Sequence, residues 1–284
     1  MAPKPGIPLS RHGVGPTSLV RAGRRGASLA GAAAGHASLG VPRALISRAL
    51  PLVHDLVATD APDVALAVAR YRNLASSYDL RTASGDAYRK QAVVALAPAP
   101  GETIVDVGCG TGLNFALVER GVGLGGRLIG VDVSAEMLDH AQARVEEHGW
   151  ANVALLQAAA EEVRIPAQAD AALLCGVHDI MRSPVALANV LRQLVDGGRV
   201  VAGGPKWAPW WRPTGVAQNV STWAVNRDYV TTFEGFERPW SQLAALIGDL
   251  EVWDVYWGGG YIARGTWRDR HADPVRVVAC RATS

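Results

Sequence analysis

Three glycines separated by single residues form the strongest chemical signal in the sequence. Gly108, Gly110 and Gly112 follow the short apolar run IVDV and precede a segment with helical character. A glycine turn between a strand and a helix lets the backbone approach a nucleotide-like ligand, and amides at the helix start can meet an anionic group. The stretch therefore predicts a cofactor-binding loop.

Two acidic residues flank this loop. Asp106 lies two residues before the first glycine, and Asp132 ends the next expected strand, 20 residues after Gly112. A carboxylate at the second position can accept hydrogen bonds from both hydroxyls of a ribose. The alternatives are that Asp106 only forms the turn and that Asp132 only begins the next helix.

The glycine spacing separates this loop from that of the dinucleotide-binding proteins. Their fingerprint is G-x-G-x-x-G, whereas this chain has G-x-G-x-G with Leu113 at the position of the third dinucleotide glycine. A ligand without a pyrophosphate does not need that third glycine. The spacing therefore disfavours a dehydrogenase and favours a different nucleoside ligand.

Strands and helices alternate on both sides of the loop. Asp60 and Pro62 predict the start of one helix, and residues 85–96 predict another. The expected strands span residues 102–107, 127–133, 153–156, 171–175 and 199–202. The expected helices between them span residues 113–120 and 134–148, and a third begins at Ser183-Pro184 and ends at Gly197-Gly198. Such alternation is typical of a parallel sheet covered by helices on both faces.

The last eighty residues hold eight of the nine tryptophans. A helix is expected over residues 240–247. Residues 251–256 and 275–280 are expected to form a closing antiparallel pair, with residues 261–267 as the rival for the final strand. Tryptophans at this density predict a roomy aromatic pocket or lid, although a single tryptophan more often packs in a core.

With these residues in order, the sequence resembles the class I S-adenosylmethionine-dependent methyltransferases, in the small-molecule branch called type 11 or type 25. The resemblance rests on VDVGCGTG at 105–112, GVDVSAEML at 130–138 and VDGGRVV at 195–201, and it covers roughly residues 70–205. It implies an α/β fold with a Rossmann-like, doubly wound, mostly parallel seven-stranded sheet and an antiparallel C-terminal strand pair. It also implies S-adenosylmethionine as cofactor and methyl transfer as activity.

The resemblance and the loop chemistry together indicate the cofactor-binding residues. Asp106 is expected to face the amino group and Asp132 the ribose. The family usually places an Asp that binds adenine where this chain has Ala159, so Glu161, a backbone carbonyl or packing would take over; Glu161 otherwise begins a solvated helix. Tyr78, which precedes Asp79 as in related enzymes, is interpreted as a lid residue or a core residue. The predicted set is Tyr78, Asp106, Gly108, Cys109, Gly110, Gly112, Asp132, Val133, Met137, Ala160, Glu161 and Cys175.

The segments after the fourth and fifth expected strands are predicted to hold the acceptor. His178 is the candidate catalytic base because imidazole titrates near neutral pH, and Asp179 is considered as a group that orients it; otherwise His178 packs or caps a loop. In the predicted irregular loop 203–213, Lys206 is expected to bind an acidic group of the substrate. Trp207 and Trp211 are expected to form an apolar wall. Their alternatives are a solvated lysine and core packing.

Composition restricts the class of protein and its organisation. The chain has 284 residues, 49% of them hydrophobic, and a net charge of +2, which disfavours binding to nucleic acid. Three widely separated cysteines indicate neither a disulfide framework nor a metal site, and they favour a cytoplasmic protein. The expected organisation is a flexible basic tail over 1–54, an N-terminal helical lid over 55–100 and a methyltransferase domain over 101–284, with a Trp-rich substrate region at about 204–267. The tail holds seven Lys or Arg and no acid, and a transit peptide is its alternative interpretation.

Three functions are compatible with these observations. The first is in-line methyl transfer to an apolar small molecule, such as a polyketide or terpenoid secondary metabolite. The second is a lipid or quinone methyltransferase in peripheral contact with a membrane surface. The third is a non-catalytic relative that binds the cofactor only. The substrate, the methylated atom (O, N or C) and the oligomeric state stay open at this point.

Overall fold

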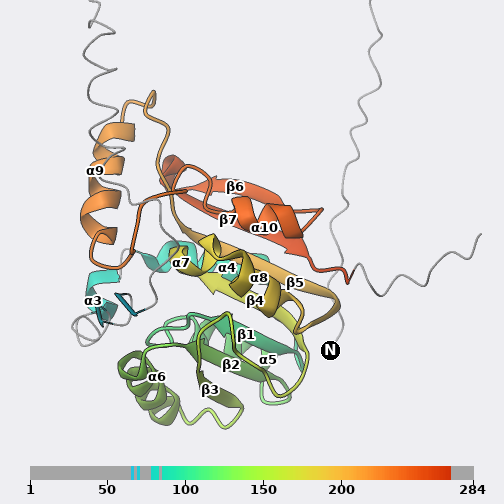
Figure 1. The fold of residues 1–284 in the computed structure, drawn as a ribbon. Helices are drawn as coiled ribbons and strands as arrows, with labels where there is room; N and C mark the ends of the chain where they lie inside the picture. The colour runs from blue at the N-terminus through green and yellow to red at the C-terminus, as the bar shows by residue number, and fades with distance from the viewer. Residues whose placement is uncertain (1–64, 67–68, 71–77, 83–84, 270–284) are drawn as a thin grey trace, which may run out of the picture. The chain divides into compact units, whose positions relative to one another are not determined.

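A single seven-stranded sheet organises the part of the chain that the computed structural model describes, which is residues 65–66, 69–70, 78–82 and 85–269 (Figure 1). The strands are β1 Thr103–Val107, β2 Arg127–Asp132, β3 Val153–Gln157, β4 Ala169–Cys175, β5 Leu194–Pro205, β6 Glu251–Val255 and β7 Gly260–Thr266. Their order is β3-β2-β1-β4-β5-β7-β6, with the first five parallel and β7 antiparallel to both β5 and β6. The predicted fold class is confirmed.

The sheet has its switch point beside β1. From β1 the chain proceeds outward through β2 to β3 and then crosses to β4 on the other side of β1. In open parallel sheets of this kind, ligands bind beyond the carboxyl ends of the strands at the position where the order reverses. The topology therefore places a binding site beyond β1 and β4.

Alternate residues of the central strands contact opposite layers of helices. Val105 and Ile129 face a core that contains α8 Pro184–Leu191 and α10 Ser241–Leu246. Ile104 and Leu128 face a second core formed with α4 Asp86–Leu96, α5 Phe115–Val122 and α6 Ala135–His148. Strands buried on both faces explain the continuous apolar runs in the sequence.

Two predicted helix starts are confirmed at atomic detail. The hydroxyl of Ser134 accepts from the N–H of Met137 at 3.3 Å, and that of Ser183 accepts from the N–H of Ala186 at 3.2 Å. A serine at this position satisfies one of the free amide groups at a helix N-terminus. α6 also ends as predicted, at Gly149 with φ of +67°.

The predicted end of α8 at Gly197-Gly198 is wrong. The helix ends at Leu191, and both glycines lie inside β5. A Cβ on Gly198 would lie 2.9 Å from Cβ of Leu194, and the backbones of Gly197 and Gly198 exchange hydrogen bonds with Trp267. The two glycines therefore allow an irregular, tightly packed turn of the backbone within β5, and they do not cap a helix.

The structure shows which of the two expected segments pairs with β6. The partner is β7, which corresponds to the rival segment 261–267, and it is the final strand of the described chain. Residues 275–280 lie outside the described residues. β5 extends to Pro205, so Gly203 and Gly204 are strand residues and not part of an irregular loop.

Some helices fall outside the predictions. α7 His178–Arg182 and α9 Gly215–Asn226 were not predicted. The helix expected from Asp60 lies mostly outside the described residues, which resume at α3 Tyr78–Thr82. No helix in the described ranges is long and apolar enough to cross a bilayer.

Candidate functional site

A cavity, called the first cavity below, opens beyond the carboxyl ends of β1, β2 and β4, where the topology predicts a ligand. Its walls combine the glycine loop, the turns after the strands, Tyr78 of α3 and a short stretch that follows α9 Gly215–Asn226. They are formed by Tyr78, Val107, Gly108, Gly110, Val131, Asp132, Val133, Met137, Ala158, Ala159, Ala160, Glu161, Gly176, Val177, His178, Asp179, Ile180, Tyr229 and Val230.

The glycine loop requires residues without side chains. Gly108 and Gly110 have φ of +68° and +55°, a region that favours glycine. A Cβ on Gly108 would lie 2.4 Å from Cγ1 of Val177. The N–H of Gly110 donates to Oδ2 of Asp132 at 2.9 Å, which fixes the loop against the end of β2.

Asp132 lies at the wall of the first cavity as a fixed carboxylate. Besides Gly110, the N–H of Ser134 donates to its Oδ1 at 2.9 Å. Burial raises the pKa of Asp132, and the hydrogen bonds from Ser134 and Gly110 oppose this shift. Each oxygen can accept a further hydrogen bond, so the position suits two vicinal hydroxyls.

Asp106 lies behind the loop rather than at the cavity wall. Both of its oxygens accept from Nδ2 of Asn114, at 3.2 and 3.0 Å, and it is fully buried. Burial raises the pKa of this carboxyl to about 7. The structure therefore does not bring Asp106 to the first cavity, and its contact with an amino group stays a prediction.

Three other predicted cofactor residues also lie outside the cavity wall. Cys109 is buried, with its sulfur 3.7 Å from the carbonyl oxygen of Gly110. A Cβ on Gly112 would lie 2.7 Å from the ring of Phe115, so this glycine lets the helix pack on the loop. Cys175 ends β4, and burial raises the pKa of its thiol. These residues shape the backbone of the site from behind.

The segment after β3, where Ala159 stands in place of the family's adenine-binding Asp, also lines the first cavity. Val133, Met137 and Ala159 supply apolar walls, together with Ala160. Oε1 of Glu161 accepts from the hydroxyl of Ser183 at 2.8 Å. This bond fixes the only carboxylate on the 158–161 segment at the wall, where an amino group could also reach it.

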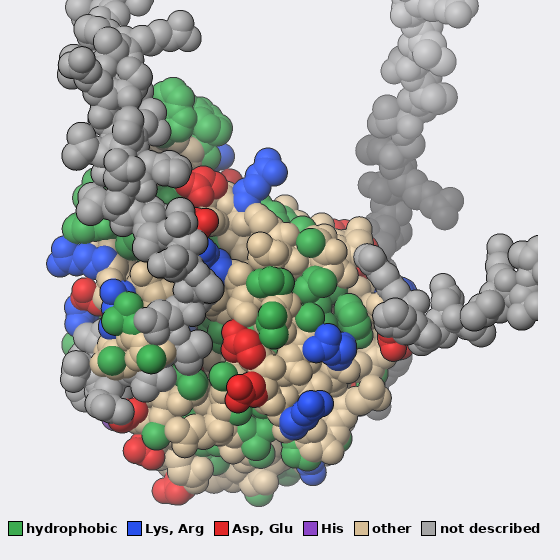
Figure 2. Space-filling view, viewed as in Figure 1, with side chains coloured by type: hydrophobic (Ala, Val, Ile, Leu, Met, Phe, Trp, Pro, Cys, Tyr) green, Lys and Arg blue, Asp and Glu red, His purple; other side chains and the backbone are tan. Residues whose placement is uncertain are grey.

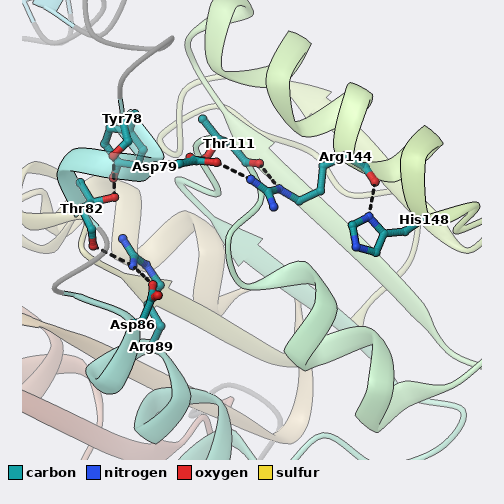
Figure 3. Close-up of polar contacts among 8 residues, drawn as sticks. All are labelled: Tyr78, Asp79, Thr82, Asp86, Arg89, Thr111, Arg144 and His148. Atoms are coloured by element: carbon teal, nitrogen blue, oxygen red, sulfur yellow. Dashed lines mark hydrogen bonds and ion pairs between the residues drawn. The ribbon is translucent and has the colours of Figure 1, made fainter.

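A clasp joins α3 to the glycine loop and to α6 (Figure 3). Oδ1 of Asp79 accepts from the hydroxyl of Thr111 at 2.5 Å, and Oδ2 accepts from the guanidinium of Arg144. Nε of Arg144 also donates to the carbonyl of Thr111 at 2.9 Å. The ring of Tyr78 meets that of Tyr229 edge-on, with centroids 5.4 Å apart. The clasp holds the Tyr78 ring over the glycine loop.

His178 occupies the start of α7 with one free ring nitrogen. Nε2 lies 2.9 Å from the carbonyl oxygen of Glu234; a carbonyl only accepts, so Nε2 carries the proton. Nδ1 is buried and has no hydrogen-bond partner among the described residues. Burial lowers the pKa of His178 to about 4, so the imidazole is neutral at pH 7. Asp179 does not orient it, because its carboxylate accepts from the N–H and hydroxyl of Thr231.

A second cavity of about 310 Å³ adjoins the first. The two share Tyr78, Gly176, His178, Tyr229 and Val230. The other walls of the second cavity are Thr82, Gly85, Tyr88, Gly204, Pro205, Gln218, Ser221, Thr222, Val225, Asn226, Tyr256, Gly259 and Gly260. His178 therefore stands at the junction of two connected cavities.

The predicted substrate residues have other contacts. Nζ of Lys206 lies 3.2 Å from Oδ1 of Asp254, and Trp207 stacks on Phe233 at 5.3 Å. Trp211 is 70% exposed. No tryptophan of the described ranges lines either cavity, so the expected tryptophan wall is replaced by tyrosines.

Most residues of the second cavity were not predicted from the sequence. Its polar wall comes from α9, where Gln218, Ser221, Thr222 and Val225 recur at helical spacing. This helical recurrence was the sequence signal that could have indicated the wall. No sequence signal pointed to Tyr88 and Tyr256, because they meet only in the folded chain, where the hydroxyl of Tyr256 accepts from the N–H of Tyr88.

Comparisons with known proteins agree with this geometry. Residues 104–198 match the family model described as a methyltransferase domain. The chain is 27% identical over 166 residues to the aklanonic acid methyltransferase of Streptomyces sp. strain C5, covering 49% of this chain and 75% of that protein. It is 31% identical over 131 residues to an uncharacterized 37.1 kDa protein in transposon TN4556 of Streptomyces fradiae, covering 44% of this chain and 36% of that protein.

One solved structure shows the same fold at low sequence identity. A chain from the complex between the Haloferax volcanii Trm112 methyltransferase activator and its methyltransferase matches with a TM-score of 0.55 and 14% identity, over 72% of this chain and 98% of that chain. The present chain thus spans between 36% and 75% of the length of the two curated relatives.

Proposed function

We propose that this chain, whose residues 104–198 match the methyltransferase-domain model, is a class I S-adenosylmethionine-dependent methyltransferase that methylates an apolar small molecule. Secondary metabolites such as polyketides and terpenoids are the proposed class of acceptor. The observation that carries the proposal is the junction at His178. There a cavity at the glycine loop meets a second cavity with room for an acceptor.

The residues of the first cavity fit S-adenosylmethionine. Its walls include three carboxylates, of Asp132, Glu161 and Asp179, and no Lys or Arg among the described residues. The cofactor carries an ammonium and a sulfonium against one carboxylate, so an acidic wall complements its net positive charge. A Cβ on Gly110 would have only the Tyr78 ring within 4 Å, at 3.9 Å, so the missing side chain there leaves space for the ligand, whereas Gly108 lets Val177 pack against the loop.

S-adenosylmethionine, when bound, supplies a methyl group already activated on sulfur, so the protein's task is to align the acceptor with it. Alignment of two reactants can contribute roughly 7–11 kcal/mol to lowering a barrier. Tyr78, Tyr229 and Val230 line both cavities and would exclude water from the junction. A dry aromatic site also favours the dispersal of positive charge in the transition state.

His178 is proposed to take the proton of the acceptor, because it lines both cavities. Because burial holds its pKa near 4, the basic form is present throughout the neutral range. We expect His178→Gln to lower kcat on a hydroxyl acceptor about tenfold while cofactor affinity survives; this is less than the usual contribution of a general base, because a pKa near 4 makes the imidazole a weak base at neutral pH. Rates measured at several pH values check this, and an unchanged kcat would remove His178 from the mechanism.

The proposal is tested by incubating the protein with methyl-labelled S-adenosylmethionine and a metabolite extract, and identifying labelled products by mass spectrometry. A labelled small molecule is the expected result. Cofactor binding by calorimetry without any labelled product would instead support a non-catalytic, cofactor-binding protein.

A second candidate, methylation of a lipid or quinone at a membrane surface, is favoured by an exposed aromatic surface. Hydrophobic side chains gather around α9 and the segment before it (Figure 2, green, upper left). Trp210, Trp211 and Trp257 are 76%, 70% and 75% exposed, and tryptophan is enriched at membrane interfaces. Co-sedimentation with liposomes, lost in the Trp210→Ala, Trp211→Ala double variant, would support this candidate; no co-sedimentation of the parent protein would exclude it.

A further inference from the structure

The walls of the second cavity carry no charged side chain. Among its lining residues, all within the described part of the chain, there is no Asp, Glu, Lys or Arg. His178 is neutral as well, because burial lowers its pKa. A charged acceptor would lose its hydration there without gaining a counter-charge, which is strongly unfavourable.

The basic residues beside this cavity are engaged elsewhere. Arg89 is only 5% exposed; it donates to the carboxylate of Asp86 at 2.8 Å, and its guanidinium lies 5.5 Å from the ring centroid of Tyr88. Lys206 follows the wall residue Pro205, but it pairs with Asp254 at 3.2 Å. Arg81 and Arg227, which adjoin the wall residues Thr82 and Asn226, both pair with Asp228, at 2.9 and 3.8 Å. A carboxylate or phosphate on the acceptor would therefore have to break an existing pair to reach any of these cations.

The walls suit a flat molecule that carries oxygen. The rings of Tyr88 and Tyr256 meet edge-on with centroids 6.3 Å apart, and both line the cavity. Burial raises the pKa of Tyr78 to about 12, so its hydroxyl stays neutral. Gly204 leaves room for a ring near the carboxyl end of β5, since the nearest atom to a Cβ there would be Cα of Gly176 at 3.7 Å. Aromatic edges and neutral hydroxyls together recognise oxygenated rings.

We propose that the second cavity takes an uncharged, oxygenated ring compound that donates an O–H or N–H group to the neutral polar side chains of α9 at its wall, which are Gln218, Ser221 and Thr222. His178 lines both cavities, so a ring held there lies beside the first cavity as well. This position brings the nucleophilic atom of the acceptor toward the cofactor side. The inference rests on the proposed methyl transfer and specifies the acceptor for it.

Three probes test the charge and the donor separately: 2-naphthol, 2-naphthoate and 2-methoxynaphthalene. Their binding to the full chain, saturated with S-adenosylhomocysteine, is measured by calorimetry or by ligand-observed NMR. We expect 2-naphthol to bind at least about tenfold more tightly than 2-naphthoate, because of the unpaired charge. We expect 2-methoxynaphthalene to bind about threefold to tenfold more weakly than 2-naphthol, because one hydrogen bond is lost.

A pair of variants on α9 locates the binding. Val225 lines the second cavity and is 40% exposed, whereas Val220 on the same helix is 62% exposed and lines neither cavity. We expect Val225→Arg to raise the affinity for 2-naphthoate about fivefold or more, and Val220→Arg to leave it unchanged. Thr222→Lys, also on the cavity wall, provides a second position for the same test.

The outcomes separate the inference from the proposed function. No heat on titration with S-adenosylhomocysteine would contradict the proposed methyl transfer. With that binding intact, 2-naphthoate binding as tightly as 2-naphthol, no binding of either, or equal effects of Val225→Arg and Val220→Arg would overturn the inference about the acceptor.

Discussion

The two cavities differ in how the chain builds them. The first is formed mainly by short segments that directly follow β1, β2, β3 and β4, and its carboxylate at Asp132 is held by two backbone amides. The second joins α3, α4, α9 and the turn before β7, which lie far apart in the sequence, and its polar groups are uncharged side chains. Backbone geometry thus determines the cofactor side, while side chains brought together by folding determine the acceptor side.

The largest expected effect tests this dependence on backbone at the glycine loop. We expect Gly108→Ala to weaken affinity for S-adenosylhomocysteine more than about 100-fold, because a Cβ there lies 2.4 Å from Val177 at a φ of +68°. Calorimetric titration measures the affinity. Gly123→Ala is the matched control, since Gly123 has a φ of +62° but nothing within 4 Å of its Cβ. Equal losses in both variants would show that backbone strain, not the shape of the loop, is responsible.

A smaller effect is expected at the carboxylate beside the loop. Asp132→Asn should weaken cofactor affinity by about 10- to 100-fold, because it removes a charge-assisted acceptor from the cavity wall. The same calorimetric titration applies. Asp170→Asn is the control, since Asp170 also accepts from a backbone N–H, that of Thr103 at 2.8 Å, but lines neither cavity. An Asp132→Asn variant with parental affinity would exclude the predicted ribose contact.

The difference between the cavities also explains what the sequence revealed. Gly108, Gly110 and Asp132 lie within 25 residues, so their spacing is visible before folding. The five parallel strands were found because buried strands are continuous apolar runs. α9 was missed because its apolar residues, such as Val220, are exposed while its polar residues face the cavity, which reverses the usual pattern.

A further prediction concerns stability on the cofactor side. The pKa of Asp106 is about 7 in the fold against an ordinary 3.8, so the folded state holds an extra proton between these values. Asp106 therefore contributes stability that is present below about pH 4 and is lost as the pH rises toward 7. In Asp106→Asn this loss disappears, because an amide side chain does not titrate. The neighbouring Asn114 can turn its own amide to pair with the new one.

Urea unfolding at pH 5 and pH 8 measures this effect. Between pH 5 and pH 8, we expect the free energy of unfolding to fall by about 1–3 kcal/mol more in the parent protein than in Asp106→Asn. This is less than the full pKa difference would give, because residual structure in the unfolded state changes the reference pKa. Identical pH dependence in the two proteins would show that Asp106 is not neutralised by its burial.

The smallest expected effect concerns the clasp that joins α3 to the glycine loop and to α6. Asp79→Asn should raise the dissociation rate of S-adenosylhomocysteine about two- to fivefold, because a partly exposed ion pair with Arg144 contributes less than about 1 kcal/mol. Asp86→Asn is the control in the same region. It removes the ion pair between the exposed Asp86 and the buried Arg89, which does not touch the glycine loop (Figure 3). Stopped-flow release measures both rates. If only Asp79→Asn releases the ligand faster, α3 couples acceptor side to cofactor side through the loop; if both do, the helix acts only by its general stability.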